Sequence, residues 1–236
     1  MTVLALEFSS AQRSVAVLAW QEGGVSPRLK TGGAMTRPCR PAIMAEAIET
    51  GADGTSTIGL IEKTLAGAGL AREQIEVIAV GLGPGSYTGI RVALALAQGW
   101  QLARGVKLLG VSSAECLAAQ AQAEEIFGRV NIVIDAQRDE VYLASYETSS
   151  RGWQETRPLR IVSLAEAQTR ADAGEIWVGP EVNRWWPKGK ILFPAAATLG
   201  QLAAGRNDFV SGDKLAPIYL RETSFVKTPP LHPTVF

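Results

Sequence analysis

Residues 81–105 read GLGPGSYTGIRVALALAQGWQLARG, a glycine-rich turn that runs directly into a long apolar segment. Gly83, Gly85 and Gly89 permit positive φ angles and close approach of the backbone to a neighbour, while Pro84 stiffens the turn. Such a turn presents backbone N–H groups that suit an anion such as phosphate, but it is equally typical of a tight strand-to-helix connection. The residues alone leave both interpretations open.

The segment after the turn predicts a helix, capped by Ser86 or Thr88. Between residues 90 and 103 it carries only three strongly polar side chains, whereas a surface helix needs one polar face. One side must pack on a sheet, and we expect another subunit to cover the opposite side. A central helix sandwiched within the monomer is the alternative. The residues expected to face the partner are Ile90, Arg91, Leu94, Ala97, Gln98 and Gln101.

The composition of the chain limits the functions open to it. Its 236 residues, 47% of them hydrophobic, suffice for one large domain or for two lobes. Lysine plus arginine and aspartate plus glutamate both number 23, so no overall positive charge drives binding to nucleic acid. No apolar stretch reaches the roughly 18 residues of a membrane span, and the N-terminus lacks a positively charged leader. We therefore expect no membrane contact.

Two residue types bear on metal sites and nucleophilic catalysis. Cys39 and Cys116 stand in no CxxC pair or zinc spacing, which favours free thiols in a reducing, cytoplasmic compartment. The single histidine, His232, lies near the C-terminus among prolines, which argues against a histidine metal site or a Ser/His/Asp triad. No catalytic residue is expected.

The apolar periodicity predicts a mixed-sheet α/β protein. The chain opens with a hairpin, and a second hairpin follows the helix of the glycine-rich turn. The expected strands are 3–7, 14–20, 25–31, 75–81, 106–111, 130–135, 140–146, 153–162 and 175–178, and the other expected helices are 41–49, 57–67, 113–125, 164–170 and 195–204.

A repeat relates the two hairpins, VLALEFSSAQRSVAVLAW at 3–20 and VNIVIDAQRDEVYLASYE at 130–147. In each, an apolar strand ends in an acid, Glu7 or Asp135, and a return strand follows. The matched Ala-Gln-Arg tripeptides occupy 11–13 and 136–138. Two hairpins of one design predict two lobes with a ligand or partner cleft between them. The acids could bind a nucleotide-associated cation through water, or could simply cap their turns.

Several blocks together resemble the TsaB (YeaZ) family, bacterial proteins of tRNA threonylcarbamoyladenosine biosynthesis. They are LALEFSS at 4–10, GLGPGSYTGIR at 81–91, GVSSAE at 110–115, IDAQRDEVY at 134–142 and PIYLR at 217–221. The resemblance implies an actin-like ATPase fold of two ribonuclease-H-like lobes with mixed sheets, the second abbreviated. We expect residues 1–105 to form the first lobe, 106–210 the second, and 211–236 a segment that packs back on the first lobe or is mobile.

The same resemblance implies a subunit that does not itself perform the transfer. Members pair with the related catalytic subunit TsaD through helices of the first lobe. With the ATPase TsaE they support transfer of threonylcarbamoyl from its adenylate to the adenosine beside the tRNA anticodon. Contact with tRNA is expected only through the complex, and a homodimer when the partner is absent. An actin-like ATPase or a peptidase acting on its own is the alternative.

Two departures from the family pattern bear on nucleotide binding. The first strand continues as Glu7-Phe8-Ser9-Ser10 where relatives commonly have Asp-Thr-Ser, which weakens the case for a nucleotide held by this lobe. Residues 37–41, RPCRP, replace a histidine-bearing stretch that often precedes the first helix. The chain is expected to have no cofactor of its own, while ATP or ADP could lie at the boundary with TsaD. The residues expected to face it are Glu7, Ser9, Gly83, Gly85, Ser86, Thr88 and Asp135.

Overall fold

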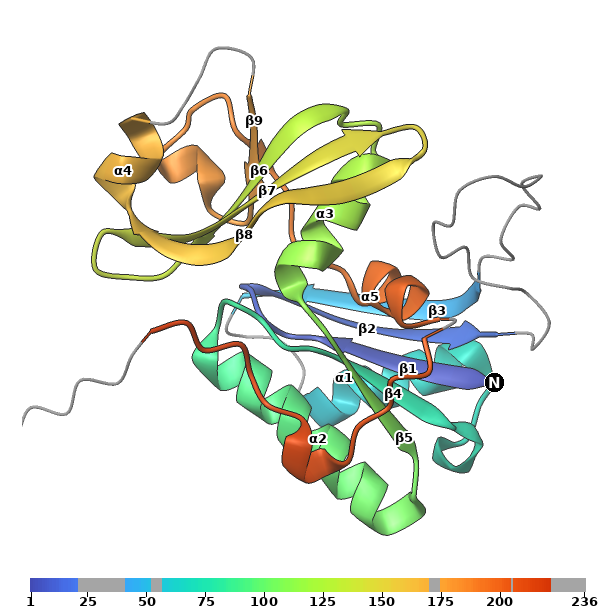
Figure 1. Ribbon diagram of the computed structural model, residues 1–236. Coiled ribbons are helices and arrows are strands. Elements are labelled where there is room, and N and C mark those ends of the chain that lie inside the picture. The colour runs from blue at the N-terminus through green and yellow to red at the C-terminus, as the bar shows by residue number, and fades with distance from the viewer. Residues whose placement is uncertain (21–40, 52–56, 170–174, 205, 222–236) are drawn as a thin grey trace, which may run out of the picture.

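Two five-stranded sheets organise the protein into two lobes (Figure 1). The computed structural model describes residues 1–20, 41–51, 57–169, 175–204 and 206–221. The expected strand at 25–31, Cys39 and His232 lie outside the described residues. Across the described ranges, no helix is long and apolar enough to cross a membrane.

The first sheet has the strand order β3-β2-β1-β4-β5. Its strands are β1 (Thr2–Glu7), β2 (Gln12–Ala19), β3 (Ala42–Thr50), β4 (Val77–Gly81) and β5 (Lys107–Val111), and its helices are α1 (Thr57–Ala68), α2 (Tyr87–Arg104) and α5 (Ala196–Ala203). β1 is apolar along its length because both of its faces are covered. Leu4 and Leu6 pack with residues of α1 and α2, whereas Val3 and Ala5 pack with residues of α5.

The second sheet has the order β10-β9-β6-β7-β8. Its elements are β6 (Gly128–Asp135), β7 (Glu140–Ser149), β8 (Gly152–Ser163), β9 (Ile176–Gly179) and β10 (Lys190–Ile191), with α3 (Ser113–Ala123) and α4 (Leu164–Thr169). Leu117 of α3 packs in the core on one face, and Ala167 of α4 in the core on the other. The indoles of Trp177 and Trp186 stack at 4.2 Å within that second core. Short 3-10 turns are η1 (Arg72–Gln74), η2 (Val182–Arg184) and η3 (Gly212–Lys214).

The two sheets share one plan. In each, three strands pair antiparallel in chain order, and two more strands add in parallel beside the first of them. This is the ribonuclease-H-like arrangement used twice, and it confirms the expected actin-like α/β fold. The second lobe is abbreviated, since β9 has four residues, β10 two and α4 six.

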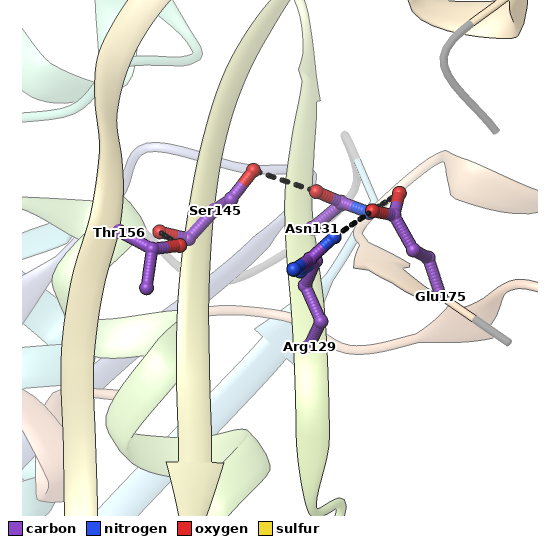
Figure 2. Close-up of polar contacts among 5 residues, drawn as sticks. All are labelled: Arg129, Asn131, Ser145, Thr156 and Glu175. Atoms are coloured by element: carbon purple, nitrogen blue, oxygen red, sulfur yellow. Dashed lines mark hydrogen bonds and ion pairs between the residues drawn. The ribbon is translucent and has the colours of Figure 1, made fainter. Parts of the chain in front are cut away.

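A ladder of polar side chains crosses the second sheet (Figure 2). Ser145 Oγ donates to Asn131 Oδ1 at 2.7 Å, and Asn131 Nδ2 donates to Glu175 Oε2 at 2.9 Å. Arg129 extends the ladder through an ion pair with Glu175 at 3.1 Å. Asn131 and Ser145 lie opposite each other on β6 and β7 and are buried, so a register shift would leave their polar atoms without partners. The ladder therefore helps to fix the strand register.

The helix expected at 41–49 is wrong, because Ala42–Thr50 forms the edge strand β3. Its alanines, glutamates and methionine favour a helix locally. Pairing with β2 along Gln12–Ala19 supplies backbone partners over the whole segment, and this tertiary contact overrides the propensity. Of the segment 37–41, residues 37–40 lie outside the described residues.

The structure also moves the lobe boundaries. β5 pairs with β4 in the first sheet, so the first lobe extends beyond residue 105 to Val111. After β10 the chain returns, and α5 packs on the first sheet. The described part of the C-terminal segment, up to residue 221, follows α2 of the same lobe. The second lobe is therefore a central insertion at residues 128–191, reached through α3.

Candidate functional site

The glycine-rich turn closes on the β1–β2 hairpin of its own lobe. A side chain at Gly85 would overlap the carbonyl oxygen of Ser9, and one at Gly89 would overlap that of Phe8. Gly85 also has φ +143°, a conformation that other residues rarely adopt. Ser86 N donates to Ser9 O at 2.6 Å, and Ser86 Oγ caps α2 by accepting from Gly89 N at 3.3 Å. These groups serve packing inside the lobe.

Glu7 ends β1 beneath this turn, and its side chain is fully buried. Oε1 accepts from Ser9 N at 2.8 Å, and Oε2 accepts from Ser113 Oγ of α3 at 3.0 Å. Gly81 leaves room for the carboxylate, since a side chain at that position would overlap it. Burial raises the pKa of Glu7, although the hydrogen bonds from Ser9 and Ser113 act in the opposite direction. Glu7 thus links β1, β4 and α3.

Replacing Glu7 with glutamine is expected to flatten the pH dependence of stability. Because folding raises the pKa of this carboxyl, the native protein keeps the proton to higher pH than the unfolded chain. The free energy of unfolding therefore falls as pH rises through the folded pKa. Glutamine can accept from Ser9 N and donate to Ser113 Oγ, yet it cannot ionise.

Urea unfolding from mildly acidic to mildly alkaline buffer measures this effect. Glu7→Gln should lose less stability than the unchanged chain as pH rises, whereas the exposed control Glu73→Gln should follow the unchanged chain. If the free energy of unfolding changed with pH equally in Glu7→Gln and in the unchanged chain, ionisation of Glu7 would not be a cause of the loss of stability.

Asp135 is the counterpart of Glu7 in the second lobe. Its Oδ1 accepts from Gln137 N at 2.7 Å, just as Glu7 accepts from the residue two positions later. Its Oδ2 pairs with Arg184 at 2.8 Å. The repeat of acid-ended hairpins holds, but the matched tripeptides do not correspond, because Gln12 begins β2 while Gln137 lies in the turn before β7. The matching tripeptides therefore suggested more structural similarity than the two hairpins have, because only the two acids occupy equivalent positions.

A cleft of about 940 Å³ lies between the lobes. Of the residues expected to face a nucleotide, its lining includes Ser9, Gly85, Ser86 and Asp135 and leaves out Glu7, Gly83 and Thr88. Four arginines also line it, Arg91, Arg138, Arg184 and Arg221. Among the described residues, no group of three or more His, Cys, Asp or Glu side chains is placed to hold a metal ion. The cleft is thus rich in arginine.

Most of the residues expected to face a partner are covered by this chain itself. Three of them lie in the core against the first sheet and are at most 5% exposed, namely Ile90, Leu94 and Ala97. Gln98 Nε2 donates to Gly212 O at 2.7 Å, and Gln101 Oε1 accepts from Gly212 N at 2.7 Å. Arg91 remains exposed. The expected interface is corrected: the sequence showed that α2 is apolar on several sides, but it did not distinguish the core side from the outer side.

The apolar part of α2 that stays open lies next to α1. A groove of about 370 Å³ runs between the two helices. Its apolar lining consists of Ile58, Ile61, Ala95, Leu96, Gly99, Trp100 and Ala103. Ile58 is 55% exposed and Leu102 of α2 is 89% exposed. The small residues at 95, 99 and 103 recur every four positions along one helix face, which is the signal that could have found this groove from the sequence.

Two ribonuclease-H-like sheets with a cleft between them define a protein with the actin-like ATPase fold. Residues 55–224 match the family described as "TsaD: tRNA N6-adenosine threonylcarbamoyltransferase". The chain belongs to this family, and its similarities place it with the TsaB (YeaZ) proteins.

Three comparisons support that placement. The chain is 29% identical over 179 residues to the "tRNA threonylcarbamoyladenosine biosynthesis protein TsaB" of Escherichia coli K12, covering 69% of this chain and 78% of that protein. The solved structure "YeaZ from Pseudomonas aeruginosa" is 26% identical with a TM-score of 0.72, covering 93% of this chain and 99% of that one. A second structure, of an uncharacterized protein "with similarity to peptidase YEAZ" from Pseudomonas aeruginosa, is 25% identical with a TM-score of 0.71 and the same coverage.

Proposed function

We propose that this chain is the noncatalytic subunit that binds and activates TsaD when threonylcarbamoyladenosine is formed beside the tRNA anticodon. The observation that carries the proposal is the open apolar groove between α1 and α2. Ile58 exposes a large apolar side chain in this groove, and Leu102 of α2 exposes another outside it, which favours burial against another subunit. The occupant we propose is TsaD, since the family match is named for that transferase.

A supporting role in the chemistry agrees with how the chain uses its own polar groups. Glu7 is buried and accepts hydrogen bonds from Ser9 and Ser113. Asp135 pairs with Arg184. Because these acids hold the fold together, we propose that TsaD supplies the catalytic groups.

ATP or ADP is proposed to lie at the boundary with TsaD rather than in this chain alone. Ser9, Gly85, Ser86 and Asp135 line the cleft and could contact it. The N–H of Ser86 and the carboxylate of Asp135 already have partners within the chain, however. These two groups are therefore not free to bind a phosphate, and we propose that the partner donates hydrogen bonds that complete the site.

We propose that TsaE joins this pair and that tRNA is reached only through the complex. Equal numbers of acidic and basic residues, 23 each, provide no overall field for a polyanion. A homodimer through the same groove is the state we propose when TsaD is absent.

Size-exclusion chromatography with light scattering tests the pairing, on the chain alone and mixed with TsaD. We expect a mixed species that replaces any homodimer, and tRNA modification by TsaD, TsaE and ATP that depends on adding this chain. The chain alone should hydrolyse neither ATP nor peptides above background. The absence of a mixed species would contradict the proposal, and hydrolysis lost on Asp135→Asn would favour the independent enzyme.

A further inference from the structure

Residues 206–221 form a strap that follows α2 toward its N-terminus (Figure 1). Val210 N donates to Leu108 O at 3.0 Å, and Gly212 is held by the side chains of α2 described above. Ile218 N donates to Leu82 O at 2.9 Å, close to the glycine-rich turn. The strap is therefore attached to the first lobe at several points before it reaches the cleft.

At the start of α2 the strap contributes to a cluster of two tyrosines and an arginine. Arg91 Nε donates to the hydroxyl of Tyr219 at 3.0 Å, and the Arg91 guanidinium lies 4.1 Å from the ring centroid of Tyr87. The two tyrosine rings are 6.0 Å apart. Cation–π and hydrogen-bond contacts thus fix Tyr219 to the first lobe beside the cleft.

Two residues later the strap reaches the second lobe. Arg221 Nη2 donates to Ala136 O at 2.8 Å and pairs with Glu140 Oε2 at 2.6 Å. Ala136 and Glu140 flank the β6–β7 turn, which Ala136 N closes by donating to Glu140 O at 3.0 Å. Tyr219 and Arg221 both line the cleft, so this short stretch spans from one wall to the other.

We propose that residues 218–221 act as a releasable clasp that holds the two lobes together across the cleft. The first-lobe end is anchored by backbone and aromatic contacts, whereas within the described residues the second-lobe end is held by the hydrogen bond and ion pair of Arg221. Arg221 and Glu140 are each 36% exposed, so their attraction is weakened by water and by salt and the clasp can open. Its opening widens the cleft while α3 and the segment before α5 keep the lobes joined. The clasp concerns this chain alone and does not depend on TsaD.

Distances between spin labels test the clasp in the full-length chain. Labels on Lys63→Cys of α1 and Arg151→Cys of the second lobe occupy exposed sites, in a Cys39→Ser background that keeps the buried Cys116. Arg221→Glu places like charges together and should shift the distance distribution to longer, broader values. Adding Glu140→Arg to that variant should restore the narrow distribution, and high salt should broaden the parent.

A matched control removes an ion pair that does not cross the cleft. Arg160 pairs with Glu166 within the second lobe, and Arg160→Ala should leave the distribution unchanged. If Arg221→Glu does not fold, the same distances are measured in Arg221→Ala, which removes the ion pair without adding repulsion. An unchanged distribution in a folded Arg221 variant, with native circular dichroism and melting temperature, would overturn the clasp.

Discussion

Gly89→Ala is expected to destabilise the first lobe severely. The added methyl group would overlap the carbonyl oxygen of Phe8, and this obstacle is backbone that cannot change rotamer. α2 would have to move away from the β1–β2 hairpin, which separates Ser86 N from Ser9 O as well. We expect a loss of at least about 3 kcal/mol, the upper end for overpacking, and a fall in melting temperature of roughly 6–12 °C.

Calorimetry with Gly99→Ala as the matched control measures this effect. Gly99 lies in the same helix, and a methyl group added there meets nothing within 4 Å. Because alanine favours a helix over glycine by about 1 kcal/mol, the control should melt slightly higher than the unchanged chain. If both variants melted together, the close approach of Gly89 to the hairpin would not be a determinant of stability.

Ile58→Glu is expected to weaken binding to TsaD at least about tenfold, equivalent to about 1.4 kcal/mol. Ile58 stands in the groove between α1 and α2 and is 55% exposed, so a carboxylate there would have to be desolvated against an apolar partner. It lies in the first turn of α1, where an acid suits the helix dipole, so the monomer should keep its melting temperature. Affinity by titration calorimetry and tRNA modification in the full complex both report the loss.

Ile191→Glu is the matched control for this prediction. Ile191 is 50% exposed on β10 of the second lobe, away from the groove, and its replacement should leave TsaD binding unchanged. Equal losses in the two variants would indicate a general surface effect. Unchanged binding in Ile58→Glu would move the interface away from the groove.

Much of the fold could be predicted because its signals are local. The apolar runs that end at Glu7 and Asp135 indicated paired hairpins, and the turn before α2 indicated where that helix begins. The strand β3 could not be predicted in this way, since its residues favour a helix until they pair with β2. The lobe boundaries could not be predicted for a similar reason, because β5 and α5 join the first sheet from distant parts of the chain.

The candidate site, too, could be predicted only in part from the sequence. The sequence and its family resemblance singled out Ser9, Gly85, Ser86 and Asp135, which the structure brings to one cleft. They did not reveal that Glu7 is fully buried, because burial depends on α3 lying over the end of β1. Nor did they identify Arg221, which meets the second lobe only after the strap has followed α2.

The sequence by itself determined that a glycine-rich turn begins a helix too apolar to be a solvent-facing surface. Periodicity and glycine placement encode this, and both act over a few residues. Only the tertiary structure decided which sides of α2 the chain covers for itself. Leu94 packs on the sheet and Gln98 contacts the strap, whereas the apolar groove beside α1 is left open. A helix apolar on several sides has no preferred outer face until the rest of the chain has packed against it.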